Sequence, residues 1–238
     1  MLELEDLVAA NRILAEYGVI DAYGHVSVRS PRDPGRYYLA RAIAPETVQL
    51  EDILEYDLDS NALDAGERES VMERFIHGEI YRARPDVTAV VHNHSPAVVP
   101  FSVTRVPLQP VFHMASFIGQ GVPNFEIRDV QKGTDLLVRN PVLGKALATT
   151  LGSKPAALMR GHGSVTVGDS LQRAVGRSIY LEQNARMQLQ AMMIAGPGGT
   201  ITTIDEAEVA ASASWQNYAR AWPLWRSKAL ARAKAERQ

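Results

Sequence analysis

Apolar residues in the first part of the chain change from a helical spacing to short runs. Between residues 4 and 14 they recur every three or four positions, and Gly18 follows, which predicts a helix that ends at a glycine. From Tyr23 to Leu58 they form short groups, including residues 26–28 and 37–43, separated by prolines and glycines. This pattern is typical of strands joined by turns.

The stretch 67–84 returns to helical spacing. Its apolar residues predict one helix that ends at an Arg-Pro-Asp turn. On that helix Glu73 and His77 would be four residues apart, so we expect them to share one face. The β-branched run 87–91 then predicts a buried strand that leads directly into His92-Asn93-His94.

The rest of the chain predicts further strands and helices marked by caps and turns. Strands are predicted over 106–112, 156–159 and 164–167, the last two on either side of Arg160-Gly161-His162-Gly163. One helix begins at Ser95-Pro96, a second runs from Asn140-Pro141 to Leu151 and is stopped by Gly152, and a third is capped by Asp169 and ends at Ala195. The tail has a capping box of Thr203 and Glu206 and a predicted break at Pro223. We therefore expect one α/β (α+β) domain over residues 1–238, with a central sheet flanked by helices and a helical C-terminal tail.

Composition and charge narrow the possible partners. The 238 residues are 46% hydrophobic and 22% charged, which is a globular composition. The net charge of −2 gives no basic field for nucleic acid or an anionic membrane, so we expect a small molecule or another protomer as the partner. The absence of cysteine excludes disulfides and thiolate metal ligands. Because no apolar stretch approaches a membrane span and the acidic N-terminus lacks signal-peptide features, we expect a cytoplasmic location.

The six histidines carry the candidate chemistry. His92 and His94 are two residues apart at the end of a predicted strand, where side chains at i and i+2 point to the same side and can bind one ion. His162 lies between two glycines that permit a tight turn, so it is the best candidate for a third ligand. Three imidazoles leave coordination positions open, as catalytic metal sites do. An isolated His-x-His also arises by chance on a surface, so the motif alone leaves both interpretations open.

The surroundings of this motif form a longer pattern. It runs from Gly24-His25-Val26-Ser27-Val28-Arg29, through Glu73, His77, Tyr81, Arg84-Pro85-Asp86 and Ala89-Val90-Val91-His92-Asn93-His94, to His162-Gly163. This pattern resembles the class II aldolase/adducin family. The resemblance implies a three-layer fold with a central mixed or antiparallel sheet between helices. It also implies that His92, His94 and His162 bind one divalent ion per subunit, zinc or manganese, beside the catalytic acid Glu73. Members of the family are commonly tetramers with active sites at subunit interfaces, so we expect a homo-oligomer.

Departures from the sugar-phosphate members of that family indicate a different substrate. Val71-Met72 stands where these members usually have two serines, and Glu46-Thr47 where they have a Thr-Gly-type loop that binds phosphate. Aliphatic side chains cannot donate hydrogen bonds and a carboxylate repels phosphate, so a phosphorylated sugar is disfavoured. His25 replaces the family's phosphate-side asparagine, and it could pair with a carboxylate as imidazolium or donate to a ring hydroxyl as neutral imidazole. With Ser27 and Thr47 it forms the expected substrate-binding set.

A further departure concerns proton transfer. Phe112-His113-Met114 stands where aldolases of the family place a catalytic tyrosine contributed across the subunit interface, so the imidazole of His113 is the expected general acid there. These replacements resemble the decarboxylase branch, which acts on ortho-hydroxylated aromatic or pyridine dicarboxylates. The expected reaction is loss of carbon dioxide from a substrate whose hydroxylate and carboxylate are chelated by the ion, followed by ring protonation from Glu73 or His113.

Two other functions stay open. The same apparatus would serve a class II aldolase acting on a non-phosphorylated hydroxy-keto acid, because both reactions form an enolate-like intermediate. The adducin branch has the fold without catalysis, so a non-catalytic binding protein is the third interpretation. Retention of Glu73 together with all three metal histidines argues against that interpretation, because no structural need makes these residues coincide.

Other conspicuous residues have structural explanations. We expect His77 to hydrogen-bond near the site, because His92 and His94 already serve as ligands. Aromatic residues at near-helical spacing in the tail could line a substrate mouth, but such residues more often pack against a core or a neighbouring subunit, and we favour a subunit interface. They are Trp215, Tyr218, Trp222 and Trp225.

Overall fold

A seven-stranded sheet with the order β3-β2-β1-β4-β7-β6-β5 forms the centre of the protein. The computed structural model describes residues 2–212 and 216–236. Neighbouring strands are antiparallel except for β5 and β6, which are parallel, so the predicted mixed sheet is confirmed. The strands are β1 (His25–Arg29), β2 (Arg36–Ala40), β3 (Ile53–Asp57), β4 (Ala89–Asn93), β5 (Asn124–Phe125), β6 (Ala156–Met159) and β7 (Gly163–Gly168).

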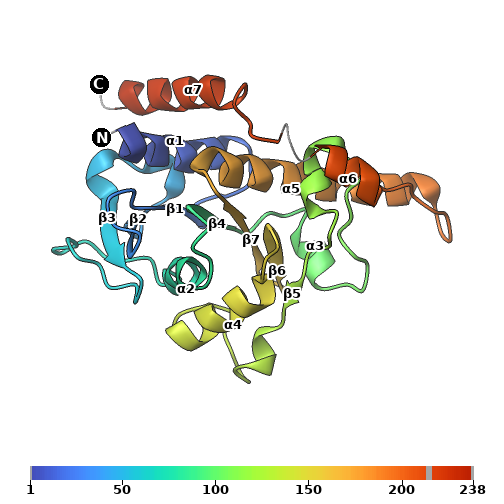
Figure 1. Ribbon diagram of the computed structural model, residues 1–238, viewed down its shortest axis with the longest axis horizontal. Helices are drawn as coiled ribbons and strands as arrows, with labels where there is room; N and C mark the ends of the chain where they lie inside the picture. The colour runs from blue at the N-terminus through green and yellow to red at the C-terminus, as the bar shows by residue number, and fades with distance from the viewer. Residues whose placement is uncertain (1, 213–215, 237–238) are drawn as a thin grey trace.

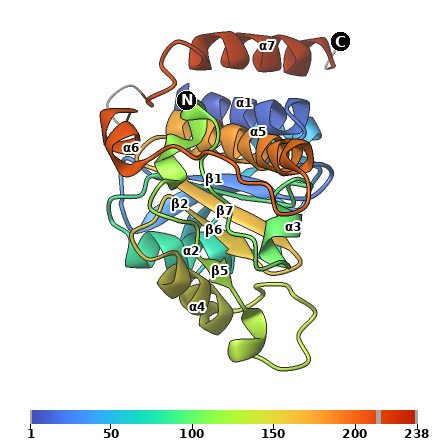
Figure 2. The same ribbon diagram turned by 90° about the vertical axis from the view of Figure 1, so that its right-hand side faces the viewer.

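Helices cover both faces of this sheet and give the three layers expected from the family resemblance. In Figures 1 and 2, α1 and α5 lie on one face, α2 and α4 lie on the other, and α7 packs outside α1. The helices are α1 (Leu2–Glu16), α2 (Phe75–Ala83), α3 (Val99–Ser102), α4 (Pro141–Leu151), α5 (Leu171–Ala195), α6 (Glu206–Ser212) and α7 (Trp222–Ala235). In the described part of the chain, no helix combines the length and apolar character needed to cross a bilayer.

The alternation of side chains along β4 determines where the site lies. Val91 belongs to the core between the sheet and α1 and α5, whereas Val90 belongs to the core between the sheet and α2 and α4. Because successive side chains of a strand point to opposite faces, His92 lies on the same face as Val90. The site therefore forms on the side of the sheet covered by α2 and α4.

The predicted helix over 67–84 is too long. The observed helix α2 begins only at Phe75, and Glu73 lies in the turn before it. One reason is that the carbonyl of Glu69 accepts a hydrogen bond from the backbone N–H of Ala42 at 2.8 Å, so it is not available to a helical turn. The expectation that Glu73 and His77 share one face of a helix was therefore wrong.

The predicted strand over 106–112 was also wrong. This segment joins no sheet strand and is held instead by side-chain amides of α5. The backbone N–H groups of Val111 and Phe112 donate to Oδ1 of Asn184 at 2.9 and 3.1 Å, and Nδ2 of Asn184 donates to the carbonyl of Gln109 at 2.8 Å. Prolines at positions 107 and 110 lack the N–H that a strand ladder needs, so side-chain partners take its place.

Helix ends agree with the sequence in part. Asn140 caps α4 as predicted, through its side chain and the N–H of Leu143. The cap of α5 is Ser170 rather than Asp169, and α6 begins with a reciprocal pair of Asp205 and Glu208 rather than with the predicted Thr203 and Glu206. The second prediction failed because Asp205, closer to the helix, offers the stronger acceptor.

Pro223 begins a helix instead of breaking one. It occupies the first turn of α7, where a missing N–H costs nothing. Tyr218, Trp222 and Trp225 are buried in this chain's own core against α1 and α5, so the predicted subunit interface was wrong for these three. Trp215 lies outside the described residues.

Candidate metal centre and active site

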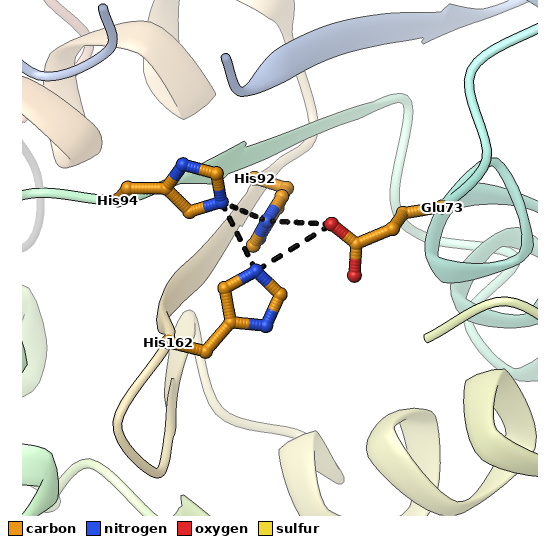
Figure 3. A group of neighbouring side chains, drawn as sticks. All are labelled: Glu73, His92, His94 and His162. Carbon is orange, nitrogen blue, oxygen red and sulfur yellow. Dashed lines mark hydrogen bonds and ion pairs between the residues drawn. The ribbon is translucent and has the colours of Figure 1, made fainter. Parts of the chain in front are cut away.

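Three separate segments bring four potential metal ligands together. His92 is the next-to-last residue of β4 and His94 follows the strand, His162 lies in the turn between β6 and β7, and Glu73 precedes α2 (Figure 3). The turn depends on glycine, since a Cβ at Gly163 would lie only 1.9 Å from the carbonyl oxygen of Asn93. Gly163 thus permits the close approach of β7 to β4, and the tight turn expected at His162 is observed.

The spacing of the ligand atoms suits one ion. Nε2 of His94 lies 3.2 Å from Nε2 of His92 and 3.0 Å from Nε2 of His162, and Oε2 of Glu73 lies 3.5 Å from the Nε2 atoms of both His92 and His162 (Figure 3). All four ligand atoms lie within 4.8 Å of one another. Ligand atoms about 2.0–2.1 Å from a tetrahedral ion would be about 3.3 Å apart, which is close to the observed spacing.

Backbone carbonyls fix the tautomers of two imidazoles. Nδ1 of His92 donates to the carbonyl of Ser164 at 3.1 Å, and Nδ1 of His162 donates to the carbonyl of Leu136 at 3.0 Å. A neutral imidazole has one N–H, so Nε2 of each presents a lone pair to the centre. His94 could donate a proton to only one of them, whereas a cation would satisfy all three nitrogens. The donor set therefore fits a divalent metal.

The charge state of the site also matches metal binding. The N–H of Val138 donates to Oε1 of Glu73 at 2.8 Å, which leaves Oε2 facing the imidazoles. Burial alone raises the pKa of Glu73, but the imidazoles of His92 and His162 outweigh burial and hold that pKa well below its ordinary value. Burial, with His92 and His162, lowers the pKa of His94 to about 4. Near neutral pH, Glu73 is thus a carboxylate and His94 a neutral imidazole, the forms that bind metals.

A pocket of about 480 Å³ opens beside these ligands. Two large apolar side chains on its lining are solvent-exposed, Tyr23 by 70% and Met72 by 51%, so apolar surface is available to an incoming molecule. The lining consists of Ala22, Tyr23, Gly24, His25, Ala42, Ile43, Ala44, Val71, Met72, Glu73, His94 and Leu137.

Of the three residues predicted to bind substrate, the structure places His25 in the pocket lining. Ser27 is fully buried, and its hydroxyl contacts Nδ1 of His77 at 2.6 Å. Thr47 is exposed and donates to the carbonyl of Ala44 at 2.8 Å. The segment that reaches the pocket is 42–44, just before the Glu46-Thr47 pair that was expected there.

The structure does not bring His113 to the four ligands of its own chain. His113 is exposed at the start of a short 3-10 helix (His113–Ile118) that packs against α5 and α6. Its carbonyl accepts a hydrogen bond from Nε2 of Gln216 at 3.1 Å. His77 is buried on α2 and hydrogen-bonded near the site, as predicted.

The loop that orients His162 and Glu73 was not predicted from the sequence. The carbonyl of Leu136 orients His162 and the N–H of Val138 orients Glu73. Both contacts use backbone atoms, which any residue supplies, so no motif marks them. The unusual feature of this loop is the positive φ of 73° at Leu136, and a backbone angle cannot be read from the sequence.

Comparison with known proteins agrees with this geometry. Residues 5–189 match the family described as Class II Aldolase and Adducin N-terminal domain. The chain belongs to the class II aldolase and adducin family. Class II aldolases use a divalent metal, in agreement with the group of Glu73, His92, His94 and His162.

Relatives within the class II aldolase and adducin family include decarboxylases. The chain is 34% identical over 246 residues to "Decarboxylase tropJ" of Talaromyces stipitatus, covering 94% of this chain and 92% of that protein. It is 29% identical over 216 residues to a 3,4-dihydroxyphthalate decarboxylase of Arthrobacter keyseri, covering 87% and 84%. These relatives fit the predicted decarboxylase branch.

A solved structure of the same family confirms the fold. The L-fuculose 1-phosphate aldolase from Glaciozyma antarctica PI12 superposes with a TM-score of 0.76 at 25% identity, covering 98% of this chain and 88% of that one. The class II aldolase fold predicted from the sequence is therefore observed.

Proposed function

We propose that this protein is a divalent-metal-dependent carboxy-lyase that releases carbon dioxide from an aromatic or pyridine carboxylate with a hydroxyl ortho to the departing group. The observation that carries the proposal is the lining of the pocket beside the ligand cluster. Ile43, Val71 and Leu137 give it apolar walls, and none of the described residues that line it is lysine or arginine. Apolar walls with few polar groups suit a planar ring.

A phosphorylated sugar fits this lining poorly. Phosphate recognition relies on guanidinium or ammonium groups, hydroxyls or backbone N–H clusters, and Val71 and Met72 offer aliphatic surface instead. The names of the decarboxylase relatives support the same substrate class for this chain.

His92, His94 and His162 would hold one zinc or manganese ion with the carboxylate of Glu73 beside it, and the bound ion supplies a Lewis acid that draws electron density from the substrate oxygens. Loss of carbon dioxide leaves the electron pair of the broken carbon–carbon bond on the ring, and a protein acid then protonates that carbon. Glu73 lines the pocket as a carboxylate. Its Oε2 would take up the proton of the substrate's ring hydroxyl and then give that proton to the ring carbon, while Oε1 keeps its hydrogen bond from the N–H of Val138. His25 contacts the polar groups of the substrate.

His113 is the second candidate for the proton donor. It is exposed and outside the pocket of its own chain, so this role requires a neighbouring subunit. We propose a homo-oligomer, a tetramer as is common in the family, in which His113 reaches the site of the adjacent protomer.

The test is elemental analysis combined with carbon dioxide release from a panel of hydroxylated phthalates and pyridine dicarboxylates. We expect stoichiometric metal and release from acids with an ortho hydroxyl, with the matched acids lacking that hydroxyl as controls. Cleavage of a non-phosphorylated hydroxy-keto acid to pyruvate or an aldehyde, without carbon dioxide, would show an aldolase instead. Efficient cleavage of sugar phosphates would refute the proposed pocket chemistry.

A further inference from the structure

A chain of short contacts runs from the pocket into the core through four polar side chains. Nδ1 of His25 lies 2.6 Å from Nε2 of His77, Nδ1 of His77 lies 2.6 Å from Oγ of Ser27, and Oγ of Ser27 lies 2.8 Å from Oη of Tyr81. His77 and Ser27 are fully buried and Tyr81 is 1% exposed. Only His25, at 7% exposure, reaches the pocket lining. The chain therefore has one end at the pocket and one end inside the protein.

Matched spacing of a strand and a helix builds this chain. His25 and Ser27 are two residues apart on β1, a rise of about 6.6 Å, and His77 and Tyr81 are four residues apart on α2, a rise of about 6 Å. The two pairs therefore interleave along their whole length. The antiparallel register places His25 opposite His92, with ring centroids 5.0 Å apart, so the pocket end of the chain lies beside a proposed metal ligand.

Counting protons leaves two arrangements. A neutral His77 has one N–H, so it donates either to His25 or to Ser27, never to both. If His77 donates to Ser27, the hydroxyl of Ser27 must donate to Tyr81, and Tyr81 must donate to the carbonyl of Thr88 at 3.5 Å. That distance is too long for a strong O–H···O bond.

The other arrangement uses only the short contacts. The hydroxyl of Tyr81 donates to Ser27, Ser27 donates to Nδ1 of His77, and Nε2–H of His77 donates to Nδ1 of His25. In this arrangement the proton of His25 is on Nε2, the nitrogen that His77 does not engage.

We propose that His77, Ser27 and Tyr81 are positioning residues that hold His25 as the neutral Nε2–H tautomer, so that the pocket presents an uncharged, fixed hydrogen-bond donor to an acceptor oxygen of the substrate. The tautomer stands on the contacts alone, whereas the role toward substrate rests on the proposed function. Burial, followed by His92, lowers the pKa of His77 to about 3, which agrees with a neutral imidazole in the middle of the chain. Acceptor oxygens that would match are a second carboxylate or a ring hydroxylate.

The tautomer is measured directly by ¹⁵N NMR of histidine-labelled, metal-free protein, because protonated and unprotonated ring nitrogens differ strongly in chemical shift. We expect His25 with its proton on Nε2 in the wild type, and a mixture of tautomers in Ser27→Ala and His77→Leu. His77→Gln is the matched variant, since its amide N–H can replace Nε2–H, and it should restore the wild-type signal. Thermal melting identifies any variant that fails to fold, and the wild-type spectrum alone still tests the assignment.

Kinetics then tests the role toward substrate, using an acid that the panel shows to be turned over. We expect His77→Leu and Ser27→Ala to raise KM by about 10- to 100-fold, the effect of one hydrogen bond to a charged acceptor, with metal content unchanged and with His77→Gln close to wild type. A proton on Nδ1 of His25 in the wild type, or an unchanged tautomer in both disruptive variants, overturns the proposal. Because the spectra need neither metal nor substrate, failure of the proposed function leaves that result unaffected.

Discussion

The carboxylate of Glu73 is divided between the backbone and the imidazoles, with Oε1 2.8 Å from the N–H of Val138 and Oε2 3.5 Å from Nε2 of His92. The amide oxygen of Glu73→Gln can still accept the hydrogen bond from the N–H of Val138, but the amide cannot take up and release a proton at the position of Oε2. We expect carbon dioxide release to fall about 10²- to 10⁴-fold, the usual contribution of a general acid or base, with little change in melting temperature. Glu55→Gln, a carboxylate outside the pocket lining, is the control. A near-wild-type rate would assign proton transfer to another group.

Removal of a single imidazole should remove the metal. His92→Ala, His94→Ala or His162→Ala leaves an incomplete donor set, and even partners that only orient ligands contribute about 10- to 100-fold in affinity or activity. We therefore expect each of these variants to lose more than about 10- to 100-fold in metal affinity and in activity, measured by elemental analysis and turnover. A chelator should inactivate the wild type, and His113→Ala should keep its metal. Full activity in a demonstrably metal-free sample contradicts the proposed site.

Stability of the metal-free protein should fall on acidification because of His77. Burial lowers the pKa of His77 to about 3, whereas in the unfolded chain it is about 6.5. The unfolded state therefore takes up a proton first as the pH falls, and His77 alone contributes a loss of stability of about 1.4 kcal/mol per pH unit between about pH 6.5 and the lower value. Urea unfolding at several pH values measures this slope, and His77→Gln should make it shallower. An identical slope in that variant would exclude His77 as its source.

A shared site should permit complementation between inactive protomers. We expect light scattering to find an active oligomer, and mixed His113→Ala and Glu73→Gln protomers to recover part of the activity, because one composite site can contain both native groups. Glu73→Gln mixed with His92→Ala is the control, since both residues come from one chain and their loss should not be complemented. An active monomer would remove the shared-site proposal.

The hydroxyl beside the departing carboxylate should be required. Without it, chelation and charge delocalisation are both lost, and discrimination of about 10⁴-fold is expected where buried polar groups are left unpaired. Competition between each hydroxylated acid and its deoxy analogue measures this ratio. Comparable rates for both acids would show that the ring oxygen takes no part.

The positions of the proposed histidine ligands could be predicted from the sequence because local features determine them. The β-branched run before His92 specifies a strand, and the glycines around His162 specify a turn, so each side chain is placed by its immediate neighbours. The start of α2 could not be predicted in this way. It depends on a bond from Ala42 to the carbonyl of Glu69, and the sequence pattern of a helix does not reveal such a distant competitor.

The pocket was harder to predict than the ligands for the same reason. Ser27 belongs to the family pattern, yet its depth in the sheet turns its hydroxyl toward His77, and a motif does not show depth. The segment 106–112 has the apolar content of a strand, but its hydrogen-bond partners are amides of Asn184 and Gln188 on α5. When the backbone of a segment is bound by side chains from a distant helix, the sequence of the segment itself does not reveal it.

The packing of α7 on α1 has a consequence for biosynthesis. Arg226 and Arg232 on α7 pair with Glu5 and Glu16 on α1, partners that are 221 and 216 residues away along the chain. Translation proceeds at about 5–20 residues per second, so the time between synthesis of α1 and synthesis of α7, which covers it, is on the order of ten seconds or more. During that interval the apolar surface that Trp225 covers is exposed to solvent or to a chaperone, so the nascent chain is more prone to aggregation before α7 emerges.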